Sequence, residues 1–235
     1  MKKALRDLSV YLLLVLAPLP FATADFEAGL DAIDRNDYGA AYAEFKTLAD
    51  QGDPDAQVNL GNLYMRGLGV AQDYAAAFDW YRKAADQNNA VAEGKLGILH
   101  YYGLGTIRDS DQAAKCFRKA AEQGEASAQT VLGTLYAQGE GVIRDPVEAY
   151  FWLTLAFDYG SEGAAQTRAS VAEEMSPGEI AEALTKVEEW KRKKGIPDPG
   201  GMSPLGTQFS EESTESAEPA RPRKGAKKPQ RKLAR

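Results

Sequence analysis

The sequence predicts an all-α solenoid, because three features recur together every 36 residues along the chain. The first feature is a Leu-Gly pair, the second is a pair of nearby glycines, and the third is an aspartate before an alanine-rich stretch. A repeat of this length with helical content indicates helix–loop–helix units that stack and bury one another. The copies are Leu60-Gly61, Leu96-Gly97 and Leu132-Gly133; Gly67/Gly69, Gly103/Gly105 and Gly139/Gly141; and Asp73, Asp109 and Asp145.

The glycines and aspartates of the repeat have predictable structural roles. In each unit the first helix carries an apolar stripe at i, i+4 and i+8, as at Ala56, Leu60 and Tyr64. Gly61 beside this stripe permits close approach of a second helix, and Gly67 ends the first helix in the left-handed conformation. The second helix is expected to bury Ala77, Trp80, Tyr81 and Ala84, with their counterparts Ala113, Cys116, Phe117 and Ala120, and Ala149, Trp152, Leu153 and Ala156.

The array is expected to span residues 25–195, beginning with a degenerate unit at residues 25–51. Asp37 in that unit is one period before Asp73, and each aspartate of this series precedes an alanine-rich run, which is typical of a helix N-cap. The series is therefore interpreted as structural rather than as an acidic binding site. Residues 176–179 read Ser-Pro-Gly-Glu, a capping box with proline at the first helical position, and predict a C-terminal capping helix.

Residues 1–24 are predicted to form a secretory signal peptide. Lys2, Lys3 and Arg6 precede an apolar run at residues 10–17, and Ala22-Thr23-Ala24 is a small-residue cleavage site. The alternative is an uncleaved membrane anchor, but a spanning helix needs roughly 20 apolar residues. Cleavage after Ala24 would place the protein in the periplasm or outside the cell.

Charge separates the body of the chain from its end. Residues 219–235 contain eight Lys and Arg and no acidic residue, whereas residues 25–218 have a large excess of Asp and Glu. The acidic body argues against nucleic-acid binding. Residues 196–235 lack periodicity and are rich in proline, glycine and charge, which predicts disorder. This tail is either simply solvated or makes an electrostatic contact with an anionic envelope surface.

The repeat resembles the Sel-one-like repeat (SLR), a subclass of the tetratricopeptide superfamily, in three copies that start near Asp53, Asn89 and Glu125. The second copy departs from the pattern at His100, in place of tyrosine, and at Cys116, in place of tryptophan. The resemblance implies a right-handed solenoid that acts as an adaptor and binds a peptide or partner helix in a concave groove lined by the first helices. Its candidate residues, which are otherwise plain solvent-facing surface, are Asn59, Asn62, Arg66, Lys95, Tyr102, Thr130, Thr134 and Gln138.

Catalytic and cofactor chemistry is not expected. His100 is the only histidine and Cys116 the only cysteine, so they cannot form a zinc site by themselves, and both are interpreted as packing residues. No nucleophile or dinucleotide motif occurs in the chain after residue 24. We therefore expect a monomeric, non-enzymatic protein-interaction scaffold of the cell envelope, without metal or cofactor. The alternatives are an envelope enzyme or accessory that acts on peptidoglycan or β-lactams, and a secreted effector that binds a host protein.

Overall fold

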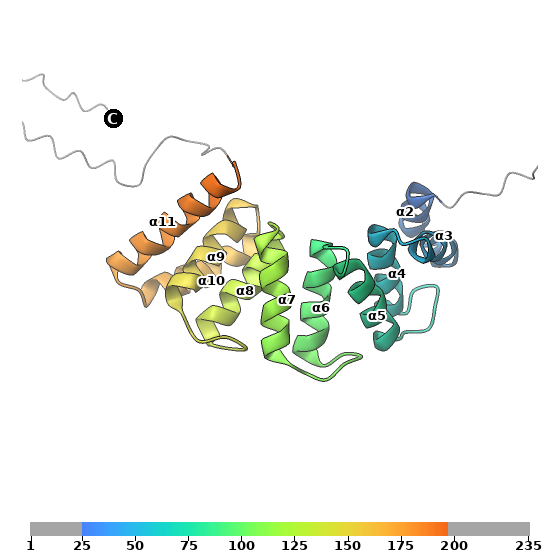
Figure 1. Cartoon of the computed structure of the whole chain (residues 1–235), viewed down its shortest axis with the longest axis horizontal. Coiled ribbons are helices and arrows are strands. Elements are labelled where there is room, and N and C mark those ends of the chain that lie inside the picture. Colours follow the sequence, from blue (N-terminus) through green and yellow to red (C-terminus); the bar gives the residue numbers. More distant parts are fainter. Residues whose placement is uncertain (1–24, 197–235) are drawn as a thin grey trace, which may run out of the picture. The chain divides into compact units, whose positions relative to one another are not determined.

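A computed structural model describes residues 25–196, in which ten α-helices follow one another with no strand (Figure 1). The predicted signal peptide, its cleavage site after Ala24, and the predicted disordered tail from Pro197 onward lie outside the described residues. The helices are α2 (Phe26–Asp34), α3 (Tyr38–Asp50), α4 (Pro54–Arg66), α5 (Tyr74–Ala85), α6 (Ala90–Tyr102), α7 (Ser110–Glu122), α8 (Ala126–Gln138), α9 (Pro146–Asp158), α10 (Glu162–Glu173) and α11 (Pro177–Lys193). The predicted all-α solenoid of helix–loop–helix repeats is confirmed.

Each full repeat is a helical hairpin whose two helices meet at a glycine. A Cβ atom added to Gly61 of α4 would lie 2.6 Å from the ring of Tyr81 on α5. The same approach recurs at Gly97, 2.8 Å from the Phe117 ring, and at Gly133, 2.7 Å from Leu153. The large side chain of the second helix therefore occupies the space that a side chain on the first helix would need. This is the role predicted for Gly61.

The predicted caps are present at the starts of the helices. The side chains of Asp37, Asp73, Asp109 and Asp145 accept hydrogen bonds from backbone amides in the first turns of α3, α5, α7 and α9. These bonds satisfy donors that have no partner within the helix. The aspartate series is therefore structural, as expected. At the other end of the first helices, Gly67, Gly103 and Gly139 adopt left-handed φ angles of 68°, 68° and 71°.

The second glycine of each loop joins neighbouring repeats. Gly105, at a φ of +68°, lies directly against the backbone carbonyl of Tyr74, at the start of the second helix of the preceding repeat. Gly69 and Gly141 make the same contact with Tyr38 and Ser110. Backbone therefore packs on backbone at this point, and the position requires glycine for both its φ angle and its lack of a Cβ. Each loop rests in this way on the repeat before it.

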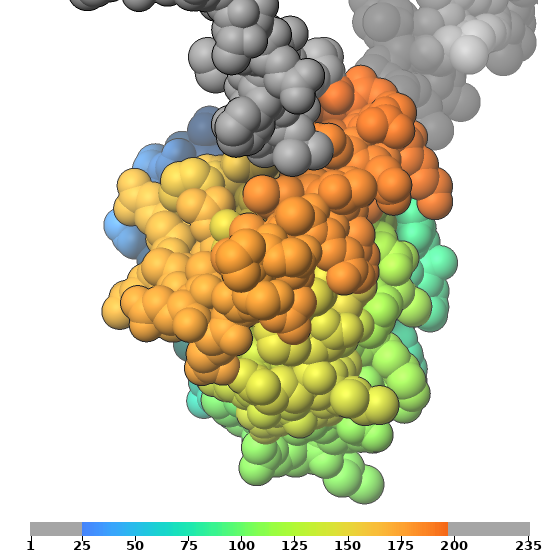
Figure 2. Space-filling model, turned by 90° about the vertical axis from the view of Figure 1, so that its left-hand side faces the viewer, coloured from blue at the N-terminus to red at the C-terminus, as the bar shows by residue number. Residues whose placement is uncertain are grey.

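Two further helices, α10 and α11, follow the last full repeat. The helix α10 packs beside α8 and α9 as a first helix would, and α11 then packs on α9 (Figures 1 and 2). Ser176 and Glu179 form the predicted capping box at the start of α11, and Ala183 and Val187 are its buried residues. The capping helix thus covers apolar surface of the last full repeat.

The expected burial of Trp80 is wrong. Its counterpart Trp152 is 4% exposed, but Trp80 is only half-buried, and the Lys83 ammonium lies 3.7 Å from its ring centroid. Tyr81 fills the core of this hairpin instead, with 0% exposure. A tryptophan at the edge of the second helix can remain partly in water because a cation over its face stabilises it there.

Replacing Gly105 by alanine is expected to lower the free energy of unfolding by about 2 kcal/mol or more, since it adds a strained φ angle and a clash with the backbone at Tyr74. Urea denaturation followed by circular dichroism measures the change. The control is Gly163→Ala in α10, where a Cβ would meet nothing within 4 Å and φ is ordinary. If the two substitutions lower the free energy of unfolding equally, the close packing of Gly105 against the backbone of Tyr74 is contradicted.

Candidate functional site

A hollow of about 160 Å³ lies between the first helices of adjacent repeats, α6 and α8. Phe117 of α7 lies between these helices and contributes to the lining. Gly94 of α6 leaves the space open, because a Cβ there would meet no atom closer than 4.0 Å. The walls are mainly apolar, with one cation, Lys95, and one carboxylate, that of Glu125, which caps α8. The remaining lining residues are Val91, Ile98, Ser127, Ala128 and Val131.

The structure divides the eight predicted groove residues into two groups. Lys95 lines the hollow, and Arg66, Tyr102 and Gln138 are exposed at equivalent positions in the last turns of α4, α6 and α8. Tyr102 is 65% exposed, which is unusual for so large a ring. These four side chains are open to a partner.

The two predicted asparagines already have intramolecular partners. Asn59 donates its side-chain amide to the backbone carbonyl of Asp55, at 3.0 Å. Asn62 accepts a hydrogen bond from the hydroxyl of Tyr81, at 2.9 Å, and so satisfies that buried phenol. Burial raises the pKa of Tyr81, so its hydroxyl remains a donor to Asn62.

The two predicted threonines are also engaged within the fold. Thr134 donates to the backbone carbonyl of Thr130, at 2.9 Å. Thr130 donates to the carbonyl of Ala126 and lies 2.8 Å from the hydroxyl of Ser161, which joins α8 to the start of α10. The sequence did not distinguish these internal bonds from exposed polar surface, because the partners are a turn away or in the next repeat.

Apolar residues of the same surface were missed. Ile98 and Val131 occupy the repeat positions of Asn62 and Asn59, and both line the hollow, together with Val91, which is 46% exposed. The prediction selected polar residues only. The 36-residue period would have found these positions, because it assigns them to the same helix face.

A buried polar cluster lies at the junction of α6 and α7. Glu93 is 5% exposed and accepts a hydrogen bond from Lys119 at 2.9 Å. That bond raises the pKa of Lys119. Glu93 stands where the other repeats have Gln57 and Gln129, whose amides donate to carbonyl groups of the preceding helix at 3.2 and 3.1 Å. The second repeat thus replaces an amide contact with an ion pair.

Cys116 is half-buried, so its expected full burial is wrong, as for Trp80, and His100 is also half-buried and packs on a neighbouring ring. Burial, and secondarily the negative charge of Glu93, raise the pKa of the Cys116 thiol to about 11. The ring of His100 packs edge-on against Phe78, with centroids 5.3 Å apart. Its Nδ1 atom is buried without a hydrogen-bond partner among the described residues.

Two structural absences apply to the described part of the chain. Residues 25–196 contain no group of three or more His, Cys, Asp or Glu side chains placed to hold a metal ion. None of the helices in that range is both long enough and apolar enough to span a bilayer.

The hairpin stack, with its glycine loops and the hollow between first helices, defines a helical-repeat solenoid. More specifically, residues 54–89, 90–125 and 126–160 match the Sel1 repeat, so the chain carries three consecutive copies of it. This confirms the repeat type predicted from the sequence. Proteins built from Sel1 repeats are generally scaffolds for protein–protein interaction and typically lack catalytic activity.

Solved structures agree with this assignment. A protective antigen from uropathogenic Escherichia coli strains, which displays an SLR fold, is 29% identical, with a TM-score of 0.61 over 70% of this chain and 37% of that chain. The chain therefore matches little more than a third of that protein's length. A Sel1 repeat protein from Oxalobacter formigenes is 29% identical, with a TM-score of 0.56 over 74% of this chain and 79% of that one. No curated protein sequence matches the chain.

The raised pKa of Cys116 predicts how its alkylation depends on pH. Because the folded state favours the neutral thiol, reaction with iodoacetamide should be slow near neutrality and rise about tenfold per pH unit between about pH 7 and 9. The rate in urea, where burial is lost, provides the comparison. A folded-state rate equal to the urea rate at the same pH would contradict the burial of this thiol.

Proposed function

We propose that the protein is a non-enzymatic scaffold of the cell envelope that binds an extended peptide segment along the first helices of its repeats. The observation that carries this proposal is the hollow between α6 and α8, whose mainly apolar walls also carry Lys95 of α6 and Glu125 at the start of α8. A hollow of about 160 Å³ is too small to enclose most substrates but can take one side chain of a bound segment. A solenoid surface of this kind is typical of peptide recognition.

The chemistry of the surface defines the segment that would fit. Val91, Ile98 and Val131 favour an aliphatic side chain, and the ammonium of Lys95 favours a carboxylate beside it. Lys95 has no carboxylate partner among the described residues. The exposed Arg66, Tyr102 and Gln138 offer one further contact from each repeat. A partner segment that crosses three repeats would meet all of these groups in order.

Reversing the charge at both Arg66 and Lys95 is expected to weaken partner capture at least about fivefold, because each loses one charge pair with the partner. The measurement is affinity capture from an envelope extract by the immobilised protein, with the captured bands quantified by mass spectrometry. The melting temperature should not change, because neither side chain has an ion pair within residues 25–196.

The matched control for this experiment is charge reversal at Arg35 and Arg192, which are exposed and lie outside the three full repeats. The double reversal has the same net charge, so a general electrostatic effect would weaken capture equally in both proteins. If the substitutions at Arg66 and Lys95 leave capture unchanged, the assignment of the binding surface is wrong.

Export and envelope contact form a separate part of the proposal, supported by the basic start, apolar run and Ala22-Thr23-Ala24 site of the leader, and by the basic residues 219–235. The expected result is recovery of a protein that begins at Asp25 from the periplasmic or culture fraction.

Truncation after Ser210 should reduce binding to anionic vesicles, by about 1 kcal/mol for each basic residue that contacts the surface. Unchanged vesicle binding would show that the basic segment makes no such contact.

A further inference from the structure

Gly94 differs from the other glycines that lie inside the helices of residues 25–196, beyond the first turn. A Cβ atom at Gly29, Gly61, Gly97 or Gly133 would lie within 2.8 Å of a large side chain on the second helix of the same unit. A Cβ atom at Gly94 would meet nothing closer than 4.0 Å, and its φ angle is not positive. Glycine inside a helix lowers stability relative to alanine. No packing contact within the described residues thus accounts for glycine at this position.

The equivalent position is filled at the junction before it. Val58 of α4 stands one period before Gly94, is 6% exposed, and belongs to the same buried cluster as Tyr81. Tyr81 is the counterpart of Phe117, which lines the hollow between α6 and α8. By this equivalence, the side chain of Val58 occupies between α4 and α6 the space that stays open between α6 and α8.

The equivalent position is also filled at the junction after it. Thr130 of α8 stands one period after Gly94, and its hydroxyl lies 2.8 Å from that of Ser161 at the start of α10. The junction between α4 and α6 has a polar bridge as well, because Asn89 donates to the carboxylate of Asp55 at 2.8 Å. Both neighbouring junctions are therefore closed by a side chain at this position and by a hydrogen bond between their first helices.

The junction between α6 and α8 is built differently at each of these positions. The position of the two bridging residues is taken by Glu125, whose carboxylate accepts hydrogen bonds from Ser127 and from the amide of Ala128, both in α8. The position that accepts the bridge between α4 and α6 is taken by Val91, which has no polar side-chain atom and is 46% exposed. With Gly94 adding no side chain, the apolar walls of this hollow remain open to solvent.

We propose that Gly94 determines the specificity of the binding surface between α6 and α8, and that the hollow receives one valine or isoleucine side chain of the bound segment. This inference rests on the proposed function, because it concerns the same surface. The protein's own occupants of the equivalent positions, Val58 and Thr130, are both β-branched. The walls favour the aliphatic one, since Phe117 and Ile98 offer no hydrogen-bond partner to a hydroxyl.

A peptide-display selection separates this inference from the function on which it rests. The purified protein and its Gly94→Val variant are each used to select from one random-peptide library. The unmodified protein should recover peptides with valine or isoleucine at one aligned position, and Gly94→Val should recover peptides without this preference. If no peptide is enriched, the proposed function is wrong, and this inference falls with it. If peptides are enriched without the aliphatic preference, or if Gly94→Val retains it, only the role of Gly94 is wrong.

A selected peptide, labelled with fluorescein, then gives the size of the effect by fluorescence anisotropy. Gly94→Val should weaken its binding at least about tenfold, because the new side chain occupies the hollow. Replacing the aliphatic residue of the peptide by alanine should weaken binding to the unmodified protein to a similar extent. The same replacement should hardly change binding to Gly94→Val, because the contact is already lost. Additive effects of the two substitutions would overturn the proposal.

Two further variants control for changes of the fold. Gly163→Val in α10 is the matched control, because a Cβ atom there also meets nothing within 4 Å and the residue lies outside the hollow. It should bind the peptide as the unmodified protein does, and an equal loss in Gly163→Val and Gly94→Val would overturn the proposal. Gly94→Ala adds a single methyl group and should weaken binding at least about twofold without lowering the melting temperature. Undiminished binding by Gly94→Ala would likewise contradict the role of Gly94.

Discussion

The close approach of two helices at a glycine is the constraint on which the repeat depends. At Gly61, Gly97 and Gly133 the first helix presents bare backbone, and a large side chain of the second helix lies against it. Because that side chain is buried, the contact fixes the distance and rotation of the two helices in each hairpin. The caps, the loops and the junctions between repeats all follow from hairpins of one shape placed at one interval.

The buried faces and the outer faces of the repeats therefore differ in how much their residues vary from copy to copy. The faces that stack are made of alanine, leucine and aromatic residues with little exposure, and they leave little freedom for substitution. The outer positions of the same period differ from copy to copy, as at Asn59, Lys95 and Val131. The hollow between α6 and α8 lies where one copy has a smaller residue than the others, Gly94 in place of Val58 and Thr130. A difference between otherwise equivalent repeats therefore contributes to this hollow.

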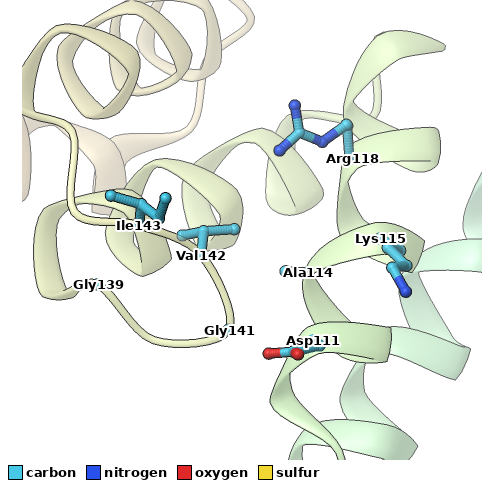
Figure 3. Close-up of a pocket in the computed structure, with 8 residues that line it drawn as sticks. All are labelled: Asp111, Ala114, Lys115, Arg118, Gly139, Gly141, Val142 and Ile143. Carbon is cyan, nitrogen blue, oxygen red and sulfur yellow. The ribbon is translucent and has the colours of Figure 1, made fainter.

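The sequence predicted the parts of the structure that local chemistry determines. The capping aspartates, the left-handed Gly67 and the capping box at Ser176 follow from short-range rules of hydrogen bonding and φ angle, and their predictions are confirmed. Trp80 was placed wrongly because its burial depends on Lys83 and on the neighbouring helix. The internal bonds of Asn62 and Thr130 were missed for the same reason, since Tyr81 and Ser161 come close only once the hairpins have packed. The open hollow between α7 and the loop that joins α8 to α9 also needed the structure, because two different repeats form it (Figure 3).

The contacts between loops and repeats all run in the same direction, since each loop packs on the repeat that precedes it in the sequence. Gly69, Gly105 and Gly141 all lie against the start of a helix that is earlier in the sequence. A chain that emerges from the ribosome, or threads through a channel, with its N-terminus first therefore exposes each receiving surface before the loop that needs it. Assembly can then proceed unit by unit in the order of synthesis, without waiting for distant segments. The direction of the loop contacts is therefore compatible with assembly of the array in the order of synthesis.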